Sequence, residues 1–168
     1  MKNDITNLIS FGKIIEIPAC DGNRKIYQES SLFRSGIDHD LKKLTLPGII
    51  TENTQVEVRE MFKDGDFLAA FEGIPTDWNY KWLSQEQVIN FRKQFPNWLR
   101  LGGNCTFVLI KKNEQLPFKI LELTKNLAVL QIYVRGDSCS VSVRELDHPS
   151  IWKAKDRHRL IVPRQWKY

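Results

Sequence analysis

The sequence predicts a single α+β domain, rich in β-structure, in which an antiparallel meander sheet or a partly closed barrel carries one amphipathic helix. Three observations favour this class. Short runs of alternating apolar and polar residues recur with turn residues between them, one segment near the middle has helical spacing, and no repeat or linker divides the chain. Because 168 residues suffice for one hydrophobic core, we expect residues 1–168 to form one domain.

The N-terminal third is the least regular part of the sequence. Residues 11–18 and 25–33 are expected to form strands around a turn at residues 20–23. Residues 37–46 instead show apolar side chains at helix-like spacing. This third therefore predicts mixed local structure.

Three β-hairpins are expected in the rest of the chain. Each joins two runs of strand-forming residues across a short turn, and two of the turns contain the Asp-Gly or Gly-Asp pair that tight turns favour. The three pairs of runs are 56–59 with 67–71, 106–110 with 118–123, and 130–134 with 139–143. A last short strand at residues 160–162 is expected at a sheet edge, because Pro163 has no N–H to donate.

The best-marked element is a helix over residues 85–95. Ser84 and Gln87 form a Ser-x-x-Gln capping box, in which each side chain satisfies a backbone N–H of the other residue. Apolar residues then recur at helical spacing, so one face is suited to burial against the sheet. These residues are Val88, Phe91 and Phe95.

Composition excludes several classes of protein. Hydrophobic residues make up 42% and charged residues 27%, which is typical of globular chains and unlike disordered ones. No apolar run is long enough to span a membrane, and the N-terminus lacks the apolar core of a signal peptide, so we expect a cytoplasmic protein without a membrane partner. The cysteines Cys20, Cys105 and Cys139 are widely spaced and are expected to be free thiols.

The candidates for catalysis are few. Asp38, His39 and Asp40 place carboxylates beside an imidazole, which suits a hydrolase or a metal site. However, adjacent side chains point in different directions, and the other histidines, His148 and His158, are distant in sequence. Glycine-rich phosphate-binding loops are absent. The sequence thus favours a non-enzymatic protein without a metal or cofactor and keeps the hydrolase as an alternative.

The charge excess lies at the C-terminus. Residues 1–148 carry 19 Lys and Arg and 19 Asp and Glu, whereas residues 149–168 carry six basic residues and one acid. Basic side chains neutralise phosphates and aromatic rings stack on unpaired bases, so we expect a nucleic-acid-binding segment here. The alternative is a solvated sheet edge with packed aromatic rings. The candidate residues are Trp152, Lys153, Lys155, Arg157, Arg159, Arg164 and Trp166; in an extended strand the four cations from Lys153 to Arg159 share one side.

A second function is suggested by Trp78, Tyr80 and Trp82. If this segment is extended, the three rings share one face and offer a docking site for another protein, in an adaptor or an inhibitor. The alternative is that these rings pack over the helix. The sequence therefore predicts first a nucleic-acid-binding protein and second a protein-interaction module, and it does not predict the oligomeric state.

Overall fold

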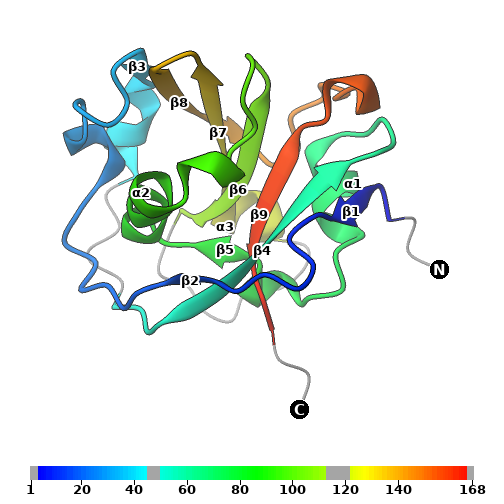
Figure 1. Cartoon of the computed structure of the whole chain (residues 1–168), viewed down its shortest axis with the longest axis horizontal. Coiled ribbons are helices and arrows are strands. Elements are labelled where there is room, and N and C mark those ends of the chain that lie inside the picture. The colour runs from blue at the N-terminus through cyan, green and yellow to red at the C-terminus, as the bar shows by residue number, and fades with distance from the viewer. Residues whose placement is uncertain (1–3, 45–49, 113–121, 166–168) are drawn as a thin grey trace.

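The computed structural model describes residues 4–44, 50–112 and 122–165. The nine strands found in these ranges form one sheet in the order β1-β4-β9-β6-β7-β8-β3, with β2 also paired to β4 and β5 to β6 (Figure 1). The strands are β1 (Thr6–Leu8), β2 (Ile15–Ile17), β3 (Gly36–Ile37), β4 (Thr54–Met61), β5 (Trp82–Leu83), β6 (Cys105–Lys111), β7 (Leu127–Arg135), β8 (Ser138–Glu145) and β9 (Arg159–Pro163).

The predicted β-rich α+β class is confirmed, but the antiparallel meander is only partly correct. β6 runs parallel to both β5 and β9, and β3 runs parallel to β8, whereas the remaining pairs are antiparallel. The described strands form an open sheet rather than a barrel. The physical reason is that β9 inserts between β4 and β6, a pairing between segments far apart in the sequence that local alternation does not encode.

The predicted helix is confirmed as α2 (Gln85–Gln94). The Ser84 hydroxyl accepts a hydrogen bond from the Gln87 N–H at 3.1 Å, and the Gln87 side-chain oxygen accepts from the Ser84 N–H at 2.9 Å. Both arms of the capping box are therefore formed. The helix ends before Phe95 and Pro96, as a proline after the last turn requires.

The predicted return strand at residues 67–71 is wrong, because this segment forms α1 (Phe67–Glu72). The carboxylate of Asp66 caps the helix by accepting from the Ala69 N–H at 2.8 Å. Gly65 does not close a hairpin and instead pairs with Trp152. A short apolar run is compatible with either a strand or a helix, and here the N-cap decides for the helix.

Of the other two hairpins, the one at residues 130–143 is confirmed. β7 and β8 pair in antiparallel register across a turn in which Gly136 has a φ of 58°. The strand at residues 106–110 is also confirmed within β6, but its antiparallel partner is β7. The predicted partner covers residues 118–123, of which 118–121 lie outside the described residues. Its last residue, Leu123, begins the helix α3 (Leu123–Asn126).

The strand predicted at residues 160–162 exists as β9, but the sheet edge predicted for it is wrong. β9 lies between β4 and β6 (Figure 1). Its pairing with β6 ends at Ile161, so Pro163 lies beyond that ladder. On the β4 side, the Met61 N–H donates to the His158 carbonyl and the Arg164 N–H donates to the Gln55 carbonyl. Because hydrogen-bonded and non-hydrogen-bonded positions alternate in an antiparallel pair, Pro163 falls at a non-hydrogen-bonded position. A proline is therefore tolerated in this central strand.

Both faces of the sheet are covered. In β6, Val108 and Ile110 belong to a core that includes α2, whereas Phe107 and Leu109 belong to a second core that includes α1. Figure 1 shows α2 in front of the sheet. Because the central strands of the sheet are buried on both faces, their sequences are nearly continuous apolar runs.

The N-terminal third is partly as predicted. Within residues 11–18, β2 is a strand, but residues 26–28 form a 3-10 helix where a strand was expected. The helix-like spacing after residue 37 corresponds to a 3-10 helix, η2 (His39–Lys43). In the part of the chain that the structure describes, no helix has the length and apolarity needed to cross a membrane.

Candidate functional site

The C-terminal cations do not lie along one extended strand, so the predicted alternation from Lys153 to Arg159 is wrong. A 3-10 helix, η6 (Ala154–Asp156), interrupts the segment, and Arg157 after it has a left-handed φ of 51°. The chain becomes extended again only at the start of β9. Residues 153–157 therefore form a compact loop, named here the basic loop.

Trp152, predicted to stack on bases, packs into the protein. Its ring centroid lies 4.9 Å from that of Phe107, 5.4 Å from that of Phe67 and 5.2 Å from that of His158. The backbone of Trp152 also exchanges two hydrogen bonds with Gly65, at 2.8 and 3.1 Å. These contacts assign Trp152 to anchoring the basic loop. Trp166, the other predicted stacking residue, lies outside the described residues.

The carboxylate of Asp64 is a second anchor of the basic loop. It accepts from the Ala154 N–H at 2.8 Å and lies 3.1 Å from the Lys153 ammonium. The hydrogen bond from Ala154, followed by the contact with Lys153 and the charge of Lys155, lowers the pKa of Asp64. Lys155 and Arg157 are exposed on the held loop.

The remaining predicted cations are separated from this loop. Arg159 is half-buried, where its guanidinium donates to the Trp98 carbonyl at 3.1 Å and pairs with Glu60 at 3.4 Å. Arg164 follows β9 at its other end and is exposed. The structure thus brings together Lys153, Lys155 and Arg157 and excludes Arg159 and Arg164 from their group.

Two residues that the sequence did not single out adjoin the basic loop. Phe62 and Lys63 are exposed on the turn that leads to Asp64, and the Lys63 ammonium lies 5.4 Å from the centroid of the Phe62 ring. The residue Phe62 is 42% exposed. Their position directly before the Asp64-Gly65 turn could have indicated that they are exposed. Their proximity to residue 153, however, depends on the tertiary fold.

The histidine and cysteine that do meet lack the properties of a catalytic pair. The Cys105 N–H donates to Nδ1 of His158 at 3.1 Å, so the contact involves the backbone rather than the thiol. Burial raises the pKa of the Cys105 thiol to about 11 and lowers the pKa of His158. A nucleophilic cysteine needs a lowered pKa, so this arrangement does not activate the thiol.

Asp38, His39 and Asp40 serve local structure. Asp38 caps η2 by accepting from the Asp40 N–H at 3.0 Å, and its other oxygen accepts from the Val143 N–H at 3.2 Å. Asp40 pairs with Lys43 at 3.0 Å, and His39 is exposed. Among the described residues, no three His, Cys, Asp or Glu side chains cluster in a way that suits a metal ion.

The aromatic segment is not extended either. Trp78 and Tyr80 lie in a 3-10 helix, η3 (Trp78–Tyr80), while Trp82 lies in β5. Trp78 and Trp82 are half-buried, whereas Tyr80 is 58% exposed. Tyr80 and Trp82 both line a pocket of about 540 Å³, and Arg164 lines it as well. Residues from the two sequence hypotheses therefore meet at one site.

This pocket adjoins a second one of about 370 Å³, because Arg164 lines both. The two pockets collect most of the exposed apolar side chains. Of the eight large hydrophobic residues that are exposed in the described part of the chain, five line one pocket or the other. They are Leu8, Phe11, Ile14, Ile50 and Tyr80. We name these five residues and Arg164 the Arg164 surface.

The described residues thus offer two surfaces with different chemistry. The basic loop presents cations near an exposed Phe62 ring, and the Arg164 surface presents apolar side chains around pockets. Neither surface gathers the nucleophile, base and oxyanion donors of an enzyme active site in the described residues. Comparison of the chain with protein-family models, with curated proteins and with solved structures finds no match.

Proposed function

We propose that this chain is a non-enzymatic binding protein that contacts nucleic acid through the basic loop and Lys63. The observation that carries the proposal is the gathering of four exposed cations on two segments that are fixed to each other by Asp64 and by the backbone pairing at Gly65. These cations are Lys63, Lys153, Lys155 and Arg157. Fixed cations neutralise phosphates and release the counterions that surround a nucleic acid, which is the main source of sequence-independent affinity.

The loop favours single strands over duplexes. The exposed ring of Phe62 lies on the same pair of segments as the cations and supplies a stacking face for an unpaired base. A base in a duplex has both faces covered by its neighbours, so only the phosphate contacts remain there. Since phosphate contacts carry no sequence information and every base offers a face for stacking, we expect little base specificity.

Fluorescence anisotropy with labelled single-stranded and double-stranded oligonucleotides, at about 50 and 200 mM salt, tests the proposal. Replacing both Lys155 and Arg157 by alanine should weaken binding and reduce the slope of log K against log salt by ~1.4 for single strands, at about 0.7 per phosphate contact. The control replaces Lys42 and Lys93, two exposed cations on η2 and α2, and should retain the slope.

Substitution of Phe62 separates stacking from charge. Phe62→Ala should weaken binding to single strands by about 1–3 kcal/mol and leave duplex binding nearly unchanged. Equal loss in the loop variant and in the Lys42/Lys93 control would show that only net charge matters. Absence of saturable binding by the wild-type chain at low salt would overturn the proposal itself.

A further inference from the structure

We propose that the Arg164 surface is the interface between two copies of this chain in a symmetric dimer. Five exposed apolar side chains line two pockets that share Arg164, and monomeric proteins rarely gather many exposed apolar side chains in one region. Tyrosine and arginine, both present here, are also frequent among the residues that contribute most to protein interfaces. The inference is independent of nucleic-acid binding.

The shape of the surface suits pairing with itself. Lys13 N–H donates to the Ser10 carbonyl at 3.0 Å and Gly12 has a φ of 73°, so residues 10–13 form a type II turn that projects Phe11, which is 84% exposed. The hollow of about 540 Å³ beside Tyr80 lies across Arg164 from this projection. A two-fold axis near Arg164 brings the Phe11 of each copy to the hollow of the other.

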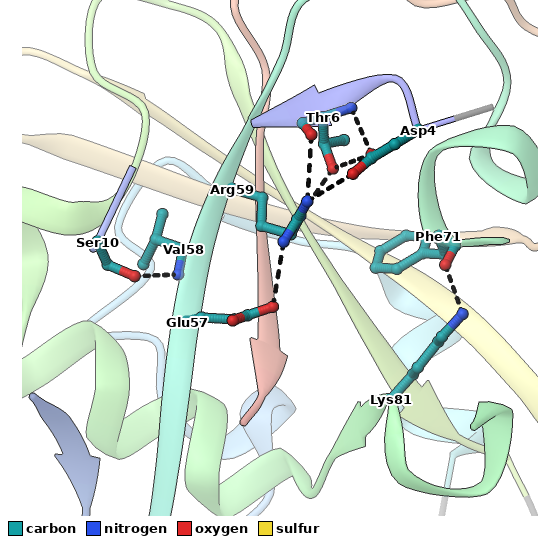
Figure 2. Close-up of polar contacts among 8 residues, drawn as sticks. All are labelled: Asp4, Thr6, Ser10, Glu57, Val58, Arg59, Phe71 and Lys81. Atoms are coloured by element: carbon teal, nitrogen blue, oxygen red, sulfur yellow. Dashed lines mark hydrogen bonds and ion pairs between the residues drawn. The ribbon is translucent and has the colours of Figure 1, made fainter. Parts of the chain in front are cut away.

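The segment that carries Phe11 is held in place before any partner binds (Figure 2). Ser10 Oγ accepts from the Val58 N–H at 2.9 Å and fixes the start of the turn. The buried guanidinium of Arg59 holds the preceding strand β1 by donating to Thr6 Oγ1 at 2.8 Å and to the Asp4 carboxylate at 2.7 Å. Preorganisation of this kind reduces the entropy lost on association.

The backbone next to Tyr80 is restrained by the contacts of Lys81. Lys81, its neighbour, is fully buried, and its ammonium donates to the carbonyl of Phe71 at 2.6 Å (Figure 2). The same ammonium lies 4.2 Å from the centroid of the Trp78 ring. The first contact fixes the end of η3 to α1 and the second connects the two ends of η3, so the exposed ring of Tyr80 starts from a restrained backbone.

The charges select a second copy rather than an acidic partner. Among the residues that line the two pockets, Lys13 and Arg164 are basic and Glu52 and Glu57 are acidic. Equal numbers of both signs leave the lining of the two pockets without a net charge, so a second copy meets no net repulsion at this surface. The chain carries a net charge of +5, and its cationic basic loop is the site that attracts a strongly acidic partner.

Light scattering after gel filtration and sedimentation velocity on the full chain, from about 1 to about 200 µM, test the dimer. The wild-type chain should dimerise, and Phe11→Glu or Tyr80→Glu should raise the dissociation constant at least tenfold, as expected for residues at the centre of an interface. Leu101→Glu and Ile151→Glu are the matched controls, because both residues are exposed but lie outside the two pockets. The controls should dimerise like the wild type.

Salt distinguishes this inference from the proposed function. Two copies with a net charge of +5 repel each other, so raising the salt from about 50 to about 500 mM should tighten the dimer while it weakens oligonucleotide binding. A wild-type chain that stays monomeric throughout would overturn the dimer. So would dimerisation that Phe11→Glu leaves intact, or that Leu101→Glu abolishes equally. Far-UV circular dichroism verifies that each variant is folded.

Discussion

The N-terminus of α2 offers a direct test of how much local hydrogen bonding contributes to this fold. Ser84 and Gln87 are 6% and 3% exposed, so water has little access to the N–H groups that their side chains satisfy. The Gln87 amide also donates to the Thr54 hydroxyl at 2.8 Å, which connects the helix to the start of β4. The perturbations are Ser84→Ala, which removes one arm of the capping box, and Gln87→Met, which removes the other arm and the connection to β4.

The expected magnitudes follow from these contacts. Loss of a serine N-cap costs about 0.5–2 kcal/mol, and burial places Ser84→Ala in the upper half of that range, at about 1.5 kcal/mol. Gln87→Met leaves the buried Ser84 N–H without an acceptor and also breaks the contact with Thr54, so about 2–3 kcal/mol is expected. For a chain of this length, each kcal/mol lowers the melting temperature by ~2–4 °C.

Urea and thermal unfolding, followed by circular dichroism at one fixed protein concentration, give these free energies. Ser138→Ala is the matched control, because the Ser138 hydroxyl donates to the Arg135 carbonyl at an exposed site. Its effect should stay below about 0.5 kcal/mol. If Ser84→Ala were as neutral as Ser138→Ala, the cap would not stabilise α2, and the reasoning from burial would be refuted.

Two further predictions concern titratable groups whose pKa is shifted by burial. Burial is the main cause that lowers the pKa of His158 below 6.5, so the unfolded chain binds this proton more readily, and the free energy of unfolding should fall as the pH drops below about 6.5. A His158→Asn variant should lose that part of the pH dependence in urea unfolding; an unchanged slope would argue against it. Burial raises the pKa of Cys105 from 9.0 to about 11, so iodoacetamide at pH 8 should modify it about 100-fold more slowly than an unburied thiol. Peptide mapping by mass spectrometry measures this rate, and labelling as fast as in urea would contradict the burial.

The helix α2 could be predicted from the sequence because its signals are local. The capping box spans four residues, and the apolar face repeats within ten. The partner of a strand has no comparable local signal. The pairing of Thr106 with Arg159 joins residues 53 positions apart, and nothing in either run specifies that they are parallel neighbours. Strands could therefore be found while the sheet order could not.

The same limit explains the outcome for the candidate site. The excess of basic residues at the C-terminus is visible in the sequence, but their arrangement depends on η6 and on the left-handed Arg157. Trp152 packs against the core because Phe67 and Phe107, distant in sequence, contact its ring. In the same way, residue type alone does not distinguish the exposed Phe11 from the buried Phe107.

The basic loop and Arg164 lie at opposite ends of β9, and this placement has a consequence for binding. The basic loop precedes β9 and Arg164 follows it, so five residues at about 3.3 Å each separate the two ends by ~16 Å. Figure 1 shows the segment before β9 at one end of that strand and the described residues after it at the other end. Pairing through the Arg164 surface therefore leaves the basic loop of each copy accessible.

A dimer with two accessible basic loops should bind long nucleic acids with avidity, because the second contact is intramolecular once the first has formed. Phe11→Glu separates the two effects, since Phe11 lies on the Arg164 surface and not on the basic loop. This variant should bind an oligonucleotide of about 8 nucleotides, which occupies one loop, as well as the wild type does, but should bind one of about 60 nucleotides at least tenfold more weakly. Equal weakening for both lengths would place Phe11 in the nucleic-acid contact itself. Equal affinity of the two proteins for the long strand would mean that the loops bind one at a time.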